Sequence, residues 1–200
     1  MSLPKKLGLA GLIAFLSAGP CLAQGKGIGI GASIGAVNDV GGKFHIDEFK
    51  PKDLNVWVDY EAQEKVLVRV TLGTLRLKGV NAGKTVSLSP GEAPVTLPPL
   101  KNDVDYATLG VSYLFVEEAG YTSGVFAGFG GYKFKPDAVA ADIANYRDQR
   151  ETAFGWHGGV DGSVQLVSRL SLTLRLTYHN IRNEAGRSIL TANAGLGYRF

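Results

Sequence analysis

The C-terminal segment, residues 190–200, alternates between apolar side chains and small or polar ones. The apolar set is Leu190, Ala192, Ala194, Leu196, Tyr198 and Phe200, and the other set is Thr191, Asn193, Gly195, Gly197 and Arg199. Because successive side chains of a strand point to opposite faces, this segment predicts a strand with one apolar and one polar face. An apolar face that ends in an aromatic residue suits a strand between lipid and a polar lumen.

Seven earlier segments show the same alternation, and with the C-terminal segment they make eight predicted strands. They are Gly27–Val37, Leu54–Glu61, Lys65–Lys78, Val104–Val116, Tyr121–Lys135, Thr152–Val164 and Leu170–Ile181. Their lengths are close to the roughly 10 residues that a tilted membrane strand needs. Since an unpaired backbone amide is costly in hydrocarbon, a spanning sheet must close. The sequence therefore predicts an all-β fold, an eight-stranded antiparallel up-and-down transmembrane β-barrel.

The connections between these segments alternate in length. Those at 61–64, 117–120 and 165–169 are short, those at 38–53, 80–103 and 136–150 are long, and 183–186 is a shorter member of the second set. Outer-membrane barrels have short periplasmic turns and longer extracellular loops, so we expect the long set outside the cell. In the third long connection, Asp137–Tyr146 predicts a short helix, because Asp137 follows Pro136 and can cap it.

Two places interrupt the alternation of apolar and polar residues. The apolar positions shift by one residue near Gly73, and a second irregularity occurs at Gly130 and Gly131. An extra residue in one strand of a pair produces such a shift, so a β-bulge near Gly73 would account for the first place, and we expect an irregularity of the strand at the second.

The N-terminus has the pattern of a secretory signal. Lys5 and Lys6 precede an apolar run from Leu7 to Leu16, and small residues follow up to Ala23. This order predicts a signal peptide over residues 1–23 and a mature barrel domain over residues 24–200, exported through the periplasm. The apolar run is shorter than the about 20 residues that a membrane-spanning helix needs. Lipidation at Cys21 is an alternative that the preceding proline fits badly.

Composition agrees with a barrel and points away from nucleic acid. Glycine accounts for 27 of the 200 residues, the net charge is only +3, and the mean hydropathy is +0.06. Ionisable residues fall on the face opposite the apolar one: Asp59, Glu61, Arg69, His157, Asp161, Arg175 and His179. Because buried charges need partners, we expect these seven to form a structural polar network that plugs the lumen.

The strand count, the alternation, the signal and the terminal Phe200 together resemble the small eight-stranded outer-membrane β-barrel family, with OmpA-like or OmpX-like barrel domains. The resemblance implies the outer membrane of a Gram-negative-type bacterium, with outer-membrane lipid and lipopolysaccharide as partners. It also implies that the barrel-insertion machinery reads the last strand, with Phe200 as the insertion signal. We expect a monomer with a structural, adhesive or surface-interaction role and without catalysis.

No catalytic, cofactor or metal site is predicted. The segment Gly79–Thr85 resembles a phosphate-binding loop, but three residues separate its glycines where four are needed, and no helix pattern follows. The segment Gly27–Ala32 matches a loose dinucleotide pattern inside an alternating strand. His157 and His179 share the inward face with Asp161, whereas metal sites usually have three or four well-placed ligands.

Two other functions remain open at this point. A lipid-A-modifying outer-membrane enzyme needs an activated serine, and the nearest histidine motif, His179–Ile181, lacks one; a serine hydroxyl near His157 or His179 at the lipid-facing rim would favour it. A soluble lipocalin-like ligand-binding barrel needs the apolar face inside.

Seven aromatic residues fall near predicted strand ends or outer faces, where interface girdles occur. They are Tyr106, Tyr113, Phe115, Tyr121, Phe134, Trp156 and Tyr198.

Overall fold

The computed structural model describes residues 27–39, 53–78, 85–86, 95–96, 101–136, 152–182 and 187–200. The helix expected at Asp137–Tyr146 and the signal expected at residues 1–23 lie outside this part of the chain. Within the described residues, no helix is both long and apolar enough to cross a membrane.

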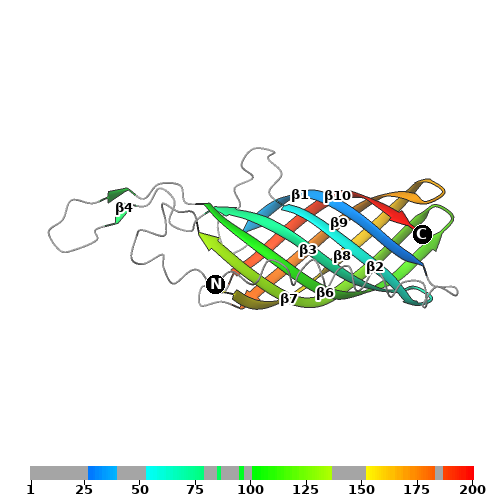
Figure 1. The fold of residues 1–200 in the computed structure, drawn as a ribbon, viewed down its shortest axis with the longest axis horizontal. Helices are drawn as coiled ribbons and strands as arrows, with labels where there is room; N and C mark the ends of the chain where they lie inside the picture. Colours follow the sequence, from blue (N-terminus) through cyan, green and yellow to red (C-terminus); the bar gives the residue numbers. More distant parts are fainter. Residues whose placement is uncertain are drawn as a thin grey trace, which may run out of the picture.

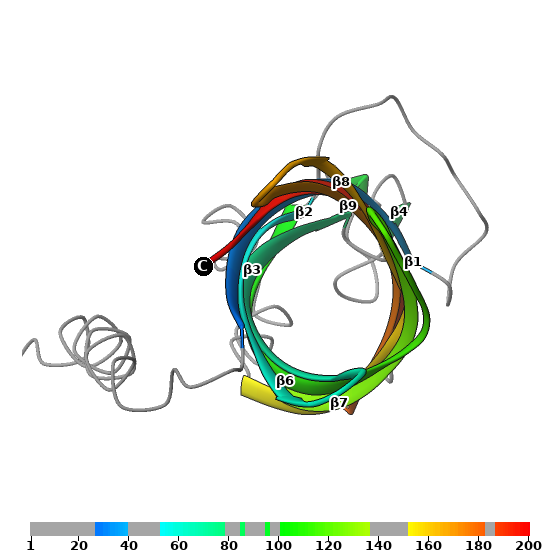
Figure 2. The same ribbon diagram turned by 90° about the vertical axis from the view of Figure 1, so that its right-hand side faces the viewer.

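The described residues form ten strands. They are β1 (Ile28–Asp39), β2 (Asp53–Gln63), β3 (Val66–Lys78), β4 (Thr85–Val86), β5 (Val95–Thr96), β6 (Lys101–Glu118), β7 (Tyr121–Pro136), β8 (Thr152–Val167), β9 (Leu170–Arg182) and β10 (Arg187–Arg199). Eight of them close into a barrel in the order β1-β10-β9-β8-β7-β6-β3-β2, whereas β4 and β5 pair with each other (Figures 1 and 2). All the barrel pairs are antiparallel, which confirms the predicted closed eight-stranded barrel.

The two ends of the barrel differ in their connections. Short turns join β2 to β3, β6 to β7 and β8 to β9 at the end where β1 begins and β10 finishes, and we call this the turn end (Figure 1, right). The opposite end, from which the long connections leave, is called the loop end. Lys65 and Gly120 take positive φ angles of 63° and 86° in two of the turns. Three register shifts lie next to these turns, at Glu61/Gln63, Leu114/Val116 and Gln165/Val167.

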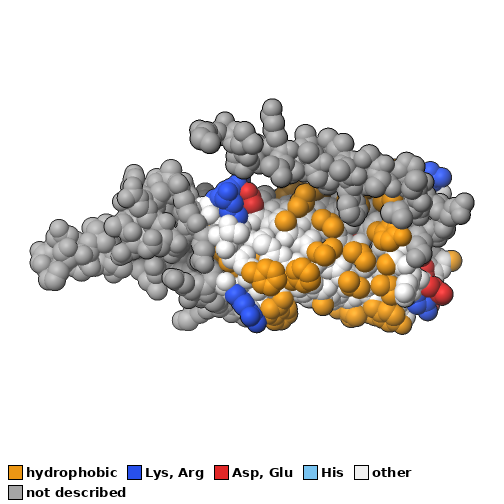
Figure 3. Space-filling view, turned by 60° about the horizontal axis from the view of Figure 1, so that its bottom comes forward, with side chains coloured by type: hydrophobic (Ala, Val, Ile, Leu, Met, Phe, Trp, Pro, Cys, Tyr) orange, Lys and Arg blue, Asp and Glu red, His pale blue; other side chains and the backbone are white. Residues whose placement is uncertain are grey.

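The apolar face of the strands points outward. Leu172, Leu174 and Leu176 of β9 are 38%, 59% and 43% exposed, whereas Asp161 and Arg175 line a cavity inside the barrel. Figure 3 shows the resulting apolar band on one side of the barrel, with charged groups near both of its ends. This orientation is opposite to the one that a lipocalin-like barrel requires.

The bulge expected near Gly73 and the irregularity expected at Gly130 and Gly131 are both wrong. The pairing of β3 with β2 and β6 and that of β7 with β6 and β8 continue through these glycines without a shift. The side chains therefore keep alternating between the two faces. Toward the loop end, however, the apolar residues lie on the inward face and the charged residues on the outward face. Toward the loop end Leu75 and Leu77 point inward and are buried, whereas Arg76 between them is exposed.

Candidate functional site: the barrel lumen

Toward the loop end, the inside of the barrel holds a cluster of buried apolar and aromatic side chains. The cluster consists of Leu75, Leu77, Val104, Tyr106, Tyr132, Phe134, Ala153, Ile181 and Ile189, each no more than 6% exposed. We call it the apolar plug. The rings of Tyr106 and Tyr132 are stacked with their centroids 6.0 Å apart. Tyr106 and Phe134 were candidates for an outer aromatic girdle or for ordinary strand packing, and the girdle interpretation is wrong for both because their side chains belong to the plug.

Next to the plug, a group of hydrogen-bonded side chains surrounds Asp53, the first residue of β2. Its carboxylate accepts hydrogen bonds from Asn193 Nδ2 at 2.5 Å, from the Tyr106 hydroxyl at 3.0 Å and from Asn55 Nδ2 at 3.2 Å. Ser33 donates to Asn55 Oδ1 at 2.7 Å. Asp53 is only 1% exposed, so these donors replace the water that its carboxylate would otherwise bind.

The two histidines lie beside this group on neighbouring strands. His157 and His179 are direct cross-strand partners, with ring centroids 6.0 Å apart. His179 Nδ1 is 2.9 Å from the Tyr132 hydroxyl, and its Nε2 is 3.4 Å from Thr191 Oγ1. Within the described part of the chain, neither ring is hydrogen-bonded to a serine, and no set of three or more His, Cys, Asp and Glu side chains is arranged to hold a metal.

Toward the turn end, Arg69 joins two carboxylates inside the barrel. Its Nε and Nη2 donate to the two oxygens of Asp59 at 2.5 and 2.7 Å, and its Nη1 donates to Asp161 at 3.3 Å. The fork of a guanidinium matches a carboxylate in this bidentate geometry. Glu61 lies farther out, at the turn-end rim, where its carboxylate is 3.9 Å from the Arg199 guanidinium.

Arg175 is the seventh of the predicted lumenal residues, and its contacts differ from those of Arg69. Its guanidinium carbon lies 3.6 Å from the centroid of the Phe126 ring. Asp161 is its cross-strand neighbour, but Arg175 makes no hydrogen bond or ion pair with the described residues. Stacking on an aromatic face supports a cation while leaving the N–H groups at its edge available.

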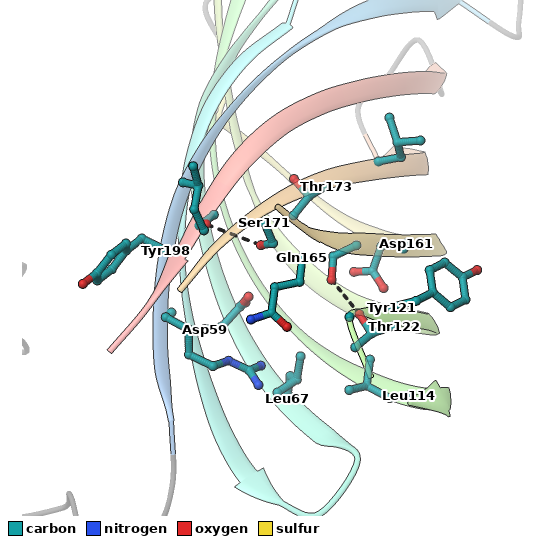
Figure 4. Close-up of a pocket in the computed structure, with 18 of the residues that line it drawn as sticks. Asp59, Leu67, Leu114, Tyr121, Thr122, Asp161, Gln165, Ser171, Thr173 and Tyr198 are labelled. Carbon is teal, nitrogen blue, oxygen red and sulfur yellow. Dashed lines mark hydrogen bonds between the residues drawn. The ribbon is translucent and has the colours of Figure 1, made fainter. Parts of the chain in front are cut away.

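The lumen contains two cavities on the turn-end side of the plug. The larger has a volume of about 270 Å³, and its lining includes Asp59, Arg69, Asp161, Thr173 and Arg175. Figure 4 shows Asp161, Thr122, Gln165 and Ser171 directed into it, whereas the Tyr121 and Tyr198 rings point away from the barrel. A smaller cavity of about 30 Å³ lies deeper, beside His157, His179 and Asn193, and it shares Arg69 and Arg175 with the first.

The space next to inward-facing glycines is filled in the loop-end half of the lumen and open in the turn-end half. At Gly73, toward the loop end, a Cβ would come within 2.5 Å of the Tyr106 ring, which occupies the space above the glycine. At Gly29, which lines the large cavity, the nearest atoms would be 3.7 Å away. Glycine therefore admits a large aromatic neighbour near the plug and leaves open volume near the turn end.

All seven ionisable residues predicted on the inward face lie on that face, with Glu61 at its rim. The sequence interpretation missed Asp53, because it placed this residue in a loop. Asp53 stands two positions before Asn55, so extending the alternation by one step assigns it to the lumen. Of the expected girdle, Tyr113, Phe115, Tyr121, Trp156 and Tyr198 are exposed on the outer surface.

The closed sheet, the outward apolar band and the polar interior define a transmembrane β-barrel. Residues 8–200 match the family described as the outer membrane protein beta-barrel domain, and the chain belongs to this family. The small outer-membrane barrel expected from the sequence is thereby confirmed.

Solved outer-membrane barrels share this fold at low sequence identity. Neisserial surface protein A is 13% identical, with 88% of this chain and 98% of that chain covered and a TM-score of 0.55. A major outer membrane protein of Thermus thermophilus is 14% identical, with 88% and 100% covered and a TM-score of 0.55. Ail of Yersinia pestis, in complex with the heparin analogue sucrose octasulfate, is 17% identical, with 88% and 97% covered and a TM-score of 0.50. No match to a curated protein is found by sequence.

Proposed function

We propose that this protein is a non-enzymatic, non-conducting outer-membrane barrel that presents its loop end at the cell surface for a structural, adhesive or surface-interaction role. The apolar plug is the observation that carries the proposal. It occupies the lumen at the loop end, where an open pore would need water-accessible walls. Lipid covers the apolar band and the plug closes the lumen at this end. The loop-end segments are therefore the part of the barrel that can contact other molecules at the cell surface.

The polar network has a structural role in this proposal. Arg69 is bonded to both Asp59 and Asp161, Asp53 is held by three donors, and His179 is bonded to Tyr132. No described serine is bonded to either histidine, and both rings face the lumen rather than the lipid-facing rim. These contacts favour a stabilising network over a lipid-A-modifying centre.

The lipid partners follow from the outer surface. The apolar band faces acyl chains, and above it the exposed side chains include Arg76, Lys133, Lys135 and Arg182. Asp103 and Asp105 pair with Arg76 and Lys135. Basic groups at this level suit the phosphates of lipopolysaccharide, which carry charge at the same depth.

Phe200 is proposed as the insertion signal. Its backbone N–H donates to the Ile28 carbonyl at 2.9 Å, and its exposed ring lies edge-on to Tyr198 with centroids 5.1 Å apart. If the insertion machinery reads this aromatic, Phe200→Ala lowers the amount of barrel in the outer membrane of cells but leaves refolding of the purified mature chain into vesicles unchanged. An equal loss in both settings would contradict a signalling role.

Single-channel recording tests the plug. The wild-type protein, refolded as a monomer in a planar bilayer, should give no stepwise conductance. A Tyr132→Ala/Phe134→Ala variant should conduct, because it removes two rings from the plug. Tyr113→Ala/Phe115→Ala, on the lipid face, is the matched control and should stay closed. Stepwise conductance of the wild-type barrel would overturn the proposal.

Labelling of intact cells tests the orientation. A membrane-impermeant maleimide should modify Lys135→Cys, at the loop end, and should fail to modify Glu118→Cys, at the turn end, until the cells are broken. The reverse pattern would refute surface display of the loop end. Binding of the same cells to immobilised heparin, chosen because Ail was solved with a heparin analogue, then tests an adhesive role.

A further inference from the structure

The turn-end cavity contains a cation, Arg175, whose N–H donors make no hydrogen bond with the described residues. A guanidinium carries five N–H donors, and none of those of Arg175 reaches a protein acceptor there. Arg175 lines both cavities, so its donors face open volume. A guanidinium inside a barrel is stable only when its donors find acceptors, because an uncompensated charge is costly to bury.

The two aspartates of the cavity, Asp59 and Asp161, are already engaged by Arg69. Asp161 is the direct cross-strand neighbour of Arg175, yet it accepts from Arg69. Arg69 also holds Asp59 through two hydrogen bonds. The Phe126 ring reaches over Gly159, where a Cβ would lie 3.0 Å from its tip, and Arg175 rests on this ring. Arg175 therefore lies on the Phe126 ring at the cavity wall without a hydrogen bond to Asp161.

The rest of the polar lining comprises two acids and two bases, Glu117, Glu118, Arg169 and Arg199, and neutral groups that can turn their donors toward a ligand. The Thr122 and Ser163 hydroxyls are 2.7 Å apart, and Ser171 makes only a 3.4 Å contact to the Gly197 carbonyl. Thr173 and Gln165 line the same volume. Hydroxyl and amide groups complete the coordination of an anion without adding charge.

We propose that the turn-end cavity is an anion-binding site in which Arg175 binds a small anion, such as a halide or a short carboxylate, that enters from the turn end. The volume of about 270 Å³ holds such an ion with part of its water. The apolar plug lies beyond the deeper cavity, so the ion binds and leaves on the same side. This makes the turn-end half a one-ended vestibule.

Trp57 provides a reporter for this site. It lines both cavities, and its ring lies 5.2 Å from the Arg69 guanidinium carbon. The chain has two tryptophans, and Trp156 is exposed on the outer surface, so Trp156→Phe leaves Trp57 as the only one. In detergent-solubilised Trp156→Phe protein, iodide should quench Trp57 with a saturating curve and more effectively than caesium, because the free N–H donors of Arg175 hold an anion in the cavity that Trp57 lines. Chloride should compete with iodide.

An Arg175→Met variant in this background should quench with iodide no better than with caesium, while quenching by neutral acrylamide stays the same. Arg182→Met, at the loop end on the outer surface, is the matched control and should keep the preference for iodide. Heat-modifiable gel mobility verifies folding of each variant. Iodide preference that survives Arg175→Met sinks the proposal. If that variant does not fold, the test uses the protein with Arg175 intact. Iodide quenching that rises linearly and is not reduced by chloride would then overturn the proposal.

Discussion

The two halves of the lumen are built on the same strands and differ in what fills them. The loop-end half holds the apolar plug, whereas the turn-end half holds the Arg69 ion pairs and a cavity of about 270 Å³. The outer surface changes in the opposite sense, from charged side chains at the loop end to an apolar band below. Where hydrocarbon surrounds the barrel, outward side chains are stabilised by lipid and the interior can be polar. Where water surrounds it, stability requires an apolar interior.

The largest effect is expected from Arg69→Met in the turn-end half. Removing this cation leaves the Asp59 carboxylate without its ion-pair partner inside the barrel and takes from Asp161 its hydrogen-bonded one. The loss should be about 3 to 5 kcal/mol of unfolding free energy, measured by urea denaturation in lipid vesicles. Combining Arg69→Met with Asp59→Asn and Asp161→Asn should restore most of it. A loss below about 1 kcal/mol, the value typical of an exposed pair, would show that the three charges are hydrated independently.

Leu75→Ala tests the plug and should cost about 3 kcal/mol, because it leaves a cavity among packed side chains. Leu174→Ala, on the lipid face, is the matched control and should cost less, since fluid acyl chains fill the space that the side chain vacates. The same denaturation assay measures both. Equal losses at the two positions would mean that the plug is not packed like a protein core.

A pair of glycine substitutions compares the two halves directly. Gly73→Ala should destabilise the barrel by about 1 to 3 kcal/mol, because the new methyl group meets the Tyr106 ring. Gly29→Ala should be neutral or stabilising by up to about 1 kcal/mol, since its Cβ meets open volume and alanine lowers the entropy of the unfolded chain. Thermal midpoints from heat-modifiable mobility rank the two variants, and the reverse order would contradict the contrast.

The smallest effect is expected from Lys135→Gln. Lys135 pairs with Asp105 on the outer surface, where both side chains are about half exposed. An exposed ion pair contributes at most about 1 kcal/mol, and the loss should shrink further as salt is added. A salt-independent loss as large as that of Arg69→Met would place this pair in a drier environment than its exposure indicates.

Much of this architecture could be predicted from the sequence, because alternation and loop length depend on local residues. The strand count and the common face of Arg69 and Arg175 follow from the alternation. The alternation alone does not give the direction of the apolar face, which was inferred from the signal pattern, the loop lengths and Phe200. The pattern failed near Gly73 and for Tyr106 and Phe134, because near the loop end apolar residues pack inside the barrel. Sequence does not show where along a strand the lipid ends.

The contacts of Arg175 could not be predicted for a different reason. Asp161 is its cross-strand neighbour, and pairing between them is the natural expectation from register. Which of two arginines takes the carboxylate depends on Phe126, which lies on another strand and offers its ring to Arg175. The partner of Asp161 thus depends on residues that are distant in sequence, and a local sequence pattern cannot predict it.

The pairing of β1 with β10 has a consequence for the order of biosynthesis. Gly29 is partnered with Arg199, so the first strand finds its neighbour only after synthesis of the whole barrel segment. Until then both margins of the sheet carry open amide and carbonyl rows, which invite association with other chains. The barrel can therefore close only when the last strand is present, and any earlier intermediate has open strand edges at which other chains can pair.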